Sequence, residues 1–287
     1  MATWRRLTAA KLLSSFIVTA AFVLGVAPAT SQDVVTIATE GTYPPWTFSN
    51  PQGGVQGFEV DLANDVCRRL SLKCEFVVQN FQGFIPGLLA GKFDVVLSAL
   101  SVTEERKKVV DFTRPYARIS NGFAVAANGP LAKMPHNGER YNLDTQLEAA
   151  QKAIDEIKPL LKGKALGTQA GSISAKFVDE FLRDTVAKVN EYKSTQDQDI
   201  DLSNGRTDIA VGSVVTLKRS LSEPILKEYI MAGPTFVGGV FGAGYGAAFR
   251  KSNEALRDKF DRALADAITD GTIKKLSDKW LGVDVTP

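Results

Sequence analysis

Apolar residues recur with two different periods along the chain. Short apolar runs at 34–39, 75–79 and 94–97 predict buried strands. Between the first two runs, apolar residues recur every four positions and predict one face of a helix: Phe58, Leu62, Val66 and Leu70. A shorter helix follows and is closed by Gly91. Strands that alternate with helices predict α/β architecture, a parallel sheet covered on both faces, and ligands bound at the carboxyl ends of strands.

The second half of the chain continues this alternation. Further strands are predicted at 122–126, 164–168, 228–232 and 245–249, and further helices at 147–161, 177–182, 256–268 and 273–281. Residues 128–142 form a polar insertion rich in Pro, Gly and Asn. Residues 233–244 are too rich in glycine for a packed element, and such a segment can absorb the backbone rotation of a hinge.

The chain contains a short internal repeat. Residues 88–96 and 201–210 both read as a helix end, a glycine, a basic residue and then an aspartate before an apolar strand. A serine follows near the end of each strand, Ser98 in one copy and Ser213 in the other. A common type of helix-to-strand connection would give the same pattern. Two similar α/β lobes explain it better, because their strand ends would then face each other across a cleft.

The predicted boundaries follow from this arrangement. One lobe is discontinuous and comprises residues 30–118 and 243–287. The other lobe comprises residues 119–242. The chain would cross between them twice, near 116–120 and near 236–244, so that its C-terminal helices return to the first lobe.

The N-terminus has the pattern of a secretory signal. Arg5, Arg6 and Lys11 precede an apolar run and a small-residue site at 27–29, so residues 1–29 are predicted to be a cleaved signal peptide. Cleavage after Ser31 is the alternative. A membrane anchor is disfavoured because the run is shorter than the roughly 20 residues of a span. The mature protein is therefore expected to be exported.

Removal of the signal changes the charge argument. The whole chain has 34 Lys and Arg against 32 Asp and Glu. Loss of the three basic residues of the signal leaves 31 against 32, a net charge of about −1. A chain without a basic excess has no electrostatic basis for binding nucleic acid.

The two cysteines, Cys67 and Cys74, are close in the sequence of an exported chain and are predicted to form a disulfide. The segment between them looks like a helix end that turns into a strand, which can bring the two residues within bonding range. The single histidine, His136, lies in a loop where a solvated side chain is expected. No metal site and no cofactor are predicted.

The segment 98–106 has the chemistry of an anion site. Hydroxyls follow a strand end, Thr103 can cap a helix, and Arg106 supplies a planar two-pronged donor that matches a carboxylate. A capped helix with a surface arginine is the plainer interpretation. Glu40 and Glu59 are suited to a cation, and aromatic residues near them supply flat apolar walls: Tyr43, Trp46 and Phe81. No catalytic constellation is evident, because no histidine accompanies a nucleophile and no phosphate loop is present.

These residues resemble a known family, the periplasmic solute-binding proteins of polar amino acid and opine ABC transporters. The matching motifs occur in order from residue 34 to the C-terminus: IATEGTYPPW at 37–46, GFEVDL at 57–62, SALSVTEER at 98–106 and DGTI at 270–273. The resemblance implies the two-lobed type II periplasmic binding protein fold, with the ligand in the interlobe cleft and a two-crossing hinge. It also implies a monomer that delivers a small molecule to an inner-membrane ABC permease and is not an enzyme.

The resemblance further implies roles for individual residues. Arg106 and Ser101 would bind the α-carboxylate, beside backbone groups of Ser98, Ala99 and the turn at 170–174. Tyr43 and Phe81 would enclose the ligand side chain, and Glu40 and Glu59 would bind its distal cationic group. The second lobe would contribute Asn121, Gln169, Gly171, Ser174 and Ser213.

One departure from the family pattern bears on the ligand. Amino acid binders usually have an aspartate where this chain has Ser213, and that aspartate pairs with the free α-ammonium. Opine binders resemble this chain in having a serine at that position. An aspartate there would repel the second, carboxyl-bearing branch of an opine. We therefore expect an octopine-like, arginine-derived opine or a basic amino acid. The alternatives are a lysine/arginine/ornithine/histidine-binding protein, an exported cyclohexadienyl dehydratase-like enzyme, and the sensory module of a membrane receptor.

Overall fold

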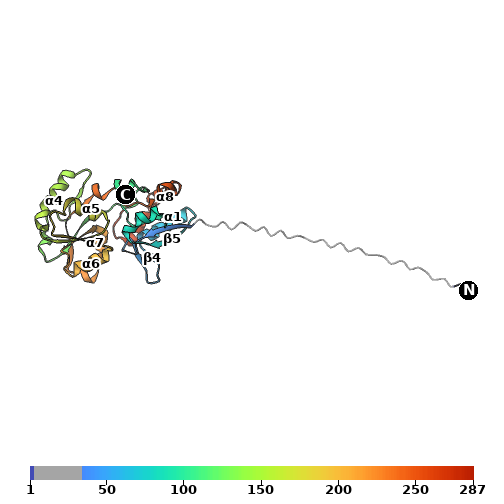
Figure 1. Ribbon diagram of the computed structural model, residues 1–287, viewed down its shortest axis with the longest axis horizontal. Coiled ribbons are helices and arrows are strands. Elements are labelled where there is room, and N and C mark those ends of the chain that lie inside the picture. The colour runs from blue at the N-terminus through green and yellow to red at the C-terminus, as the bar shows by residue number, and fades with distance from the viewer. Residues whose placement is uncertain (3–33) are drawn as a thin grey trace. The chain divides into compact units, whose positions relative to one another are not determined.

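The structure is a computed structural model that describes residues 1–2 and 34–287. The predicted signal peptide, 1–29, lies almost entirely outside the described residues. Gln32–Pro287 form one compact unit, which contains two large sheets with their helices and one small sheet (Figure 1). No helix within residues 34–287 combines the length and the apolar composition that a membrane span would need.

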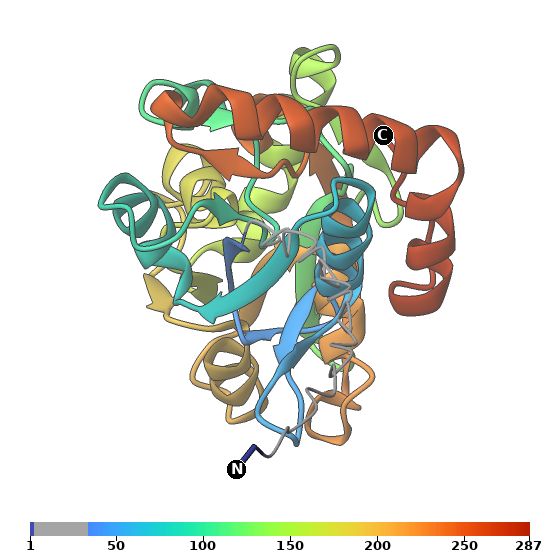
Figure 2. The same cartoon turned by 90° about the vertical axis from the view of Figure 1, so that its right-hand side faces the viewer.

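The first lobe is built on a five-stranded sheet of order β5-β1-β6-β14-β7. Its strands are β1 (Val34–Thr39), β5 (Lys73–Val78), β6 (Val95–Val96), β7 (Asp111–Phe112) and β14 (Ala248–Phe249). A small three-stranded sheet adjoins it: β2 (Thr42–Tyr43), β3 (Thr47–Ser49) and β4 (Val55–Gln56). Its helices are α1 (Phe58–Arg69), α2 (Phe84–Leu89), α3 (Glu104–Lys107), α8 (Glu254–Thr269) and α9 (Thr272–Trp280). In Figure 2 the C-terminal helices, in red, run beside elements from the first third of the chain.

The second lobe is built on a six-stranded sheet of order β11-β10-β12-β8-β13-β9. Its strands are β8 (Asn121–Ala126), β9 (Arg140–Asn142), β10 (Ala165–Gln169), β11 (Lys188–Tyr192), β12 (Ile209–Ser213) and β13 (Tyr229–Val237). Its helices are α4 (Leu147–Leu161), α5 (Ile173–Phe181), α6 (Thr195–Ser203) and α7 (Val214–Ser220). The α/β class and the two lobes agree with the sequence analysis, whereas the precise lobe limits stay a prediction.

Neither sheet is parallel throughout, so that expectation is wrong. In the first sheet β1 pairs in parallel with β5 and β6, but β14 is antiparallel to both of its neighbours. In the second sheet β8 is antiparallel to β12 and β13. The antiparallel strands β14 and β8 are those that the chain enters after crossing between lobes. They are not reached through a covering helix, which is the connection that makes neighbours parallel.

The glycine-rich segment is also packed, contrary to expectation. Strand β13 continues to Val237, through Gly233 and Pro234. Its register with β8 shifts between Ala232 and Phe236, and it then pairs with β9. Gly233 has φ 76°, a conformation that an L side chain rarely adopts. The glycine and proline therefore form a bulge inside a strand and do not end it.

The internal repeat is confirmed in detail. Gly91 and Gly205 both have a left-handed backbone, with φ 71° and 68°. The carboxylate of Asp94 accepts a bond from the Thr36 N–H of β1 at 3.1 Å, and that of Asp208 accepts one from the Ala165 N–H of β10 at 2.8 Å. In each lobe the aspartate thus ties the start of its strand to the neighbouring strand.

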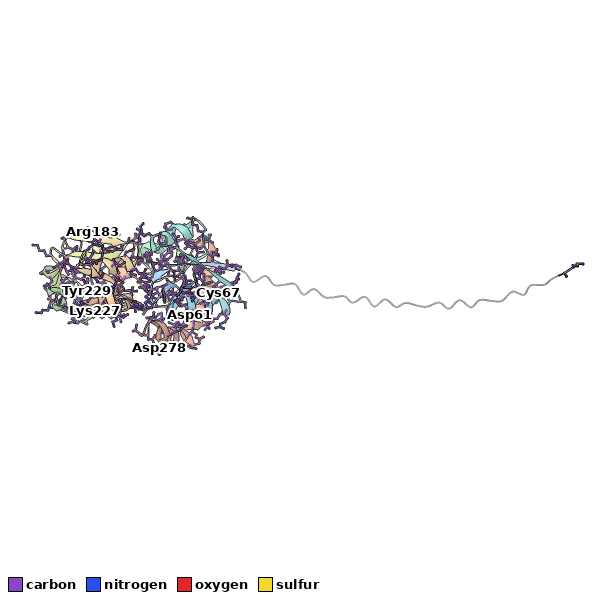
Figure 3. The ribbon with its side chains drawn as sticks, turned by 90° about the horizontal axis from the view of Figure 1, so that it is seen from below. Asp61, Cys67, Arg183, Lys227, Tyr229 and Asp278 are labelled. Carbon is purple, nitrogen blue, oxygen red and sulfur yellow. A yellow bond between two sulfur atoms is a disulfide. The ribbon has the colours of Figure 1, made fainter. Side chains whose placement is uncertain are left out.

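The two crossings between lobes lie side by side. The Tyr245 N–H donates to the Ala117 carbonyl at 2.8 Å, and the Tyr116 N–H donates to the Tyr245 carbonyl at 2.8 Å. A Cβ at Gly242, which has φ 72°, would lie 2.2 Å from the Val102 carbonyl oxygen, so the second crossing requires glycine there. The predicted disulfide Cys67–Cys74 is present in the first lobe, where Figure 3 labels Cys67, and its Cα atoms are 6.2 Å apart.

His136 is less solvated than expected. Its side chain is 19% exposed, and its Nε2 lies 2.7 Å from a carboxylate oxygen of Glu156 on α4. Tyr141 contacts its other ring nitrogen at 2.9 Å. The polar insertion is therefore attached to the second lobe by this histidine.

Candidate functional site

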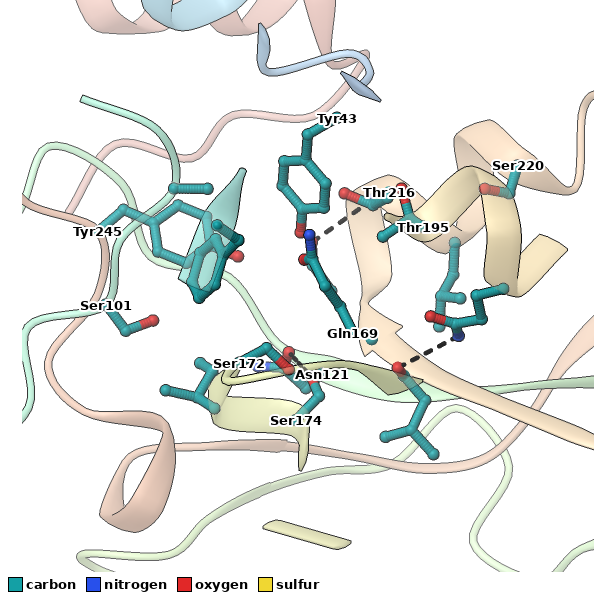
Figure 4. A pocket seen from close by; sticks show the side chains of 18 of the residues that line it. Tyr43, Ser101, Asn121, Gln169, Ser172, Ser174, Thr195, Thr216, Ser220 and Tyr245 are labelled. Carbon is teal, nitrogen blue, oxygen red and sulfur yellow. Dashed lines mark hydrogen bonds between the residues drawn. The ribbon is translucent and has the colours of Figure 1, made fainter. Parts of the chain in front are cut away.

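A cavity between the two lobes is lined by residues of both (Figure 4). Its cavity volume is about 30 Å³. Its lining residues are Tyr43, Phe81, Ala99, Ser101, Arg106, Asn121, Gln169, Ser172, Ile173, Ser174, Thr195, Gln198, Asp199, Val211, Gly212, Ser213, Thr216, Leu217, Ser220 and Tyr245. A volume of this size holds about one water molecule, so a small organic ligand would enter only if the lobes or the lining side chains moved apart.

Arg106 supplies a positive charge that has no acidic partner among the described residues. Thr103 caps α3 and accepts the Arg106 N–H at 3.3 Å, which fixes the residue at the cavity wall. The guanidinium donates to the carbonyls of Ser101 at 3.0 Å and Gly171 at 3.2 Å, and lies 5.6 Å from the ring centroid of Phe81. Burial lowers the pKa of Arg106 to about 10. No ion pair within residues 34–287 includes this guanidinium, so a ligand carboxylate would be its first counter-charge.

Glu40 is the complementary group, a buried carboxylate that has no cationic partner in the part of the chain that the structure describes. It follows β1, and its N–H donates to the Ser98 hydroxyl at 2.9 Å. Its Oε1 accepts the Gln169 side-chain amide at 2.7 Å, and among the described residues its Oε2 has no hydrogen-bond partner. Burial raises the pKa of Glu40 to about 7. Buried carboxylates in proteins are usually paired, so this one is suited to a cationic ligand group.

Glu59 holds the backbone of the cavity wall. Its Oε1 accepts the Ala99 N–H at 2.6 Å and the Tyr116 hydroxyl, and burial raises its pKa to about 7. Ala99 has φ 48°, a left-handed conformation that costs free energy for a residue other than glycine. Such a conformation persists only where surrounding contacts impose it. The Glu59 carboxylate provides one of those contacts and so directs the loop toward Ser101 and Arg106.

The second lobe presents the starts of two helices to the cavity. Ser172 caps α5 by accepting the Ala175 N–H at 3.1 Å, and Ser174 on that helix donates to Asn121 at 3.2 Å. Ser213 caps α7, where its hydroxyl accepts the Thr216 N–H at 3.5 Å. Helix N-termini carry partial positive charge, so both starts favour negatively charged ligand groups.

Three polar contacts join the lobes across the cavity. They are the Gln169–Glu40 hydrogen bond, the Arg106–Gly171 hydrogen bond and the Lys176–Glu105 ion pair. Gly171 has φ 72°, and a Cβ there would lie 3.4 Å from Cγ of Gln82 in the first lobe. Glycine therefore allows both the turn and the close approach of the lobes.

Nine of the thirteen residues predicted from the sequence line the cavity. The other four are hydrogen-bonded to residues of the cavity wall or to one another. Glu40 bonds to Gln169, Glu59 to Ala99, Ser98 to Glu40, and Gly171 to the Arg106 guanidinium. Several polar lining residues were missed, namely Thr195, Gln198, Asp199, Thr216, Ser220 and Tyr245. The spacing of Ser213, Thr216 and Ser220 by three and four residues is a signal that marks one helix face.

The chain is similar to known proteins over nearly its whole length. Residues 35–283 match the bacterial extracellular solute-binding proteins, family 3. It is 39% identical to an octopine-binding periplasmic protein of Rhizobium meliloti over 96% of this chain and 99% of that one. It is 32% identical to an L-arginine-binding protein of Pseudomonas aeruginosa over 88% of this chain and 89% of that one. An ancestral arginine-binding protein bound to arginine has a similar structure, with a TM-score of 0.73, 30% identity, and coverage of 87% of this chain and 98% of that one.

Proposed function

The chain belongs to the bacterial extracellular solute-binding proteins, family 3, with the type II periplasmic binding protein fold, and we propose that it delivers an arginine-derived opine or a basic amino acid to an ABC importer. The matched relatives include periplasmic proteins, which supports a place in the periplasm. We further propose that it acts as a monomer, reaches the periplasm through cleavage of its signal peptide, and docks on an inner-membrane permease.

One observation carries the choice of ligand class. The interlobe site combines an unpaired guanidinium, Arg106, with an unpaired buried carboxylate, Glu40, on the same lobe. A zwitterion with an α-carboxylate and a distal cationic group complements both charges. A simple anion or a simple cation would leave one of them without a counter-charge, which is costly in a closed site.

Each part of the ligand then has a partner. The α-carboxylate binds Arg106 together with the start of α5, while Tyr43 and Phe81 enclose the side chain. The distal guanidinium or ammonium group binds Glu40 and the Gln169 side-chain oxygen. Glu59 acts through the backbone of Ala99 and not by direct contact with the ligand. The ligand stabilises the closed form because it contacts both lobes.

The same charges argue against the enzyme alternative. A cyclohexadienyl acid is an anion without a cationic group, so it would leave Glu40 unpaired or would have to meet it protonated. The nearby relatives are themselves named as binding proteins.

Calorimetric titration of the refolded, ligand-free mature protein tests the proposal. Octopine is expected to bind more tightly than arginine, because Ser213, unlike an aspartate, does not repel the carboxyl-bearing branch on the α-nitrogen. Tighter binding of arginine would identify a basic amino acid receptor. Failure of both ligands, together with turnover of a cyclohexadienyl acid, would overturn the proposal in favour of the enzyme.

A further inference from the structure

The cavity continues past Ser213 into the second lobe. Ser213, Thr216 and Ser220 all line it, and their spacing places them on one face of α7. Ser213 and Ser220 are seven residues apart, which corresponds to about 10 Å along a helix. Thr195, Gln198 and Asp199 from α6 line the same end of the cavity. Figure 4 shows Thr195, Thr216 and Ser220 together, away from Ser101 and Ser174. We call this end the α6–α7 subsite.

Asp199 gives the subsite its charge. Its Oδ2 accepts the Ser220 hydroxyl at 2.5 Å, and no ion pair within residues 34–287 includes it. Burial, and secondarily the nearby Glu223 carboxylate, raise the pKa of Asp199 to about 6. Within residues 34–287 the group is thus a partly buried carboxylate that has one hydroxyl donor and no counter-charge. It can accept further hydrogen bonds from a ligand.

The remaining groups of the subsite are neutral. Gln198 is buried, and its side-chain amide donates to the Val211 carbonyl at 3.4 Å. Thr195, Thr216 and Ser220 present hydroxyl groups, while Val211 and Leu217 form an apolar wall. Hydroxyls, an amide and a carboxylate together complement a branch that carries several hydroxyl or amino donors. A ligand carboxylate at this position would meet the like charge of Asp199.

We propose that the α6–α7 subsite binds a branch on the α-nitrogen of the ligand, and that it selects a long, donor-rich branch such as a polyol over a branch that ends in a carboxylate. This inference rests on the proposed function, because Arg106 and Glu40 must first hold the amino acid part. The short carboxyethyl branch of octopine ends near Ser213 and does not reach Asp199, so octopine binds without using the subsite.

Three arginine derivatives with the same α-carboxylate and side chain test the inference. They are arginine itself, nopaline, whose branch ends in a second carboxylate, and N-α-(1-deoxyglucityl)-arginine, whose branch is a polyol. Affinities are measured by calorimetry for the wild-type protein, for Asp199→Asn, and for Glu180→Gln, which removes an exposed charge on α5 of the same lobe. Asparagine retains a partner for Ser220, and Ser220→Ala provides a second variant if the first is poorly folded.

The wild-type protein is expected to bind the polyol derivative about ten-fold more tightly than nopaline. Asp199→Asn should weaken the polyol derivative about ten-fold, strengthen nopaline several-fold, and leave arginine within about two-fold. Glu180→Gln should change none of the three. Binding of all three ligands without dependence on Asp199, or a wild-type preference for nopaline, would overturn this inference alone. Failure of all three, and of octopine as well, to bind the wild-type protein would overturn the proposed function itself.

Discussion

The two walls of the cavity differ in how they are built. The first-lobe wall carries the charged and aromatic groups, with Arg106, Tyr43 and Phe81 lining the cavity and Glu40 directly behind it. The second-lobe wall consists mainly of hydroxyls, amides and helix starts, and Asp199 is its ionisable group. The first wall complements only a ligand that carries both a carboxylate and a distal cationic group. The second wall has no charged side chain next to Ser213 among its lining residues, so ligands of one charge pattern can differ there in shape.

This difference separates two tasks. The first lobe holds the parts that all proposed ligands share, namely the carboxylate and the distal cation. The second lobe contacts what differs between them, the group on the α-nitrogen. Changes in the first lobe should therefore weaken all ligands together, whereas changes in the second should alter the ratio between ligands.

Loss of the Arg106 guanidinium should have the largest effect. Arg106→Ala should weaken both arginine and octopine by about 100-fold or more, because it removes a charge-assisted contact from a closed site. Calorimetry measures both affinities, and Lys107→Ala on the exposed side of the same helix is the matched control. A loss confined to one ligand would show that the first lobe does not serve both alike.

Titration of Glu40 should have the next largest effect. Its pKa is about 7 without ligand, so a cationic ligand must displace a proton at lower pH. Affinity for arginine should therefore rise from pH 5.5 to pH 8, by up to about 30-fold. Glu40→Gln should bind more weakly and should flatten this dependence, and an unchanged slope in that variant would contradict the assignment.

The stability of the ligand-free protein should change with pH in the opposite direction. The folded-state pKa of Glu40 lies above its ordinary value of 4.5, so between these values the folded protein holds a proton that the unfolded chain releases. Stability should then fall as pH rises through this window, and Glu59 contributes with the same sign. Thermal unfolding at pH 5 and pH 8 measures the trend.

A substitution in the second lobe should have the smallest of these effects. Ser213→Asp should favour arginine over octopine by about ten-fold, because the new carboxylate attracts a primary ammonium and repels the carboxyl-bearing branch. Aspartate also caps helices well, so α7 should be retained. Ser213→Asn, which caps without charge, should leave the ratio near its wild-type value. A ratio that changes equally in both variants would reflect shape and not charge.

The sequence predicted the first wall better than the second. Ser101 and Arg106 lie in one continuous motif, 98–106, that follows a buried strand. Glu40 and Tyr43 lie in a second continuous motif, 37–46. The missed residues of the second wall come from α6 and α7. Helix α6 is almost wholly polar, so it lacks the apolar periodicity that marks an amphipathic helix, and α7 spans only seven residues. The bulge in β13 was missed for a related reason, because glycine and proline favour a turn unless distant strands pair with them.

The place of β14 has a consequence for the order in which the lobes can form. Residues 121–237 supply all six strands of the second sheet, so that sheet is complete once they have been synthesised. The first sheet lacks the strand between β6 and β7 until Phe249 has been added. Its earlier strands therefore cannot complete their pairing before that point. The second lobe is in this sense an insertion into the first. Because Ala117 and Tyr245 are hydrogen-bonded neighbours, a short linker between them would suffice to join the two parts of the first lobe into one chain.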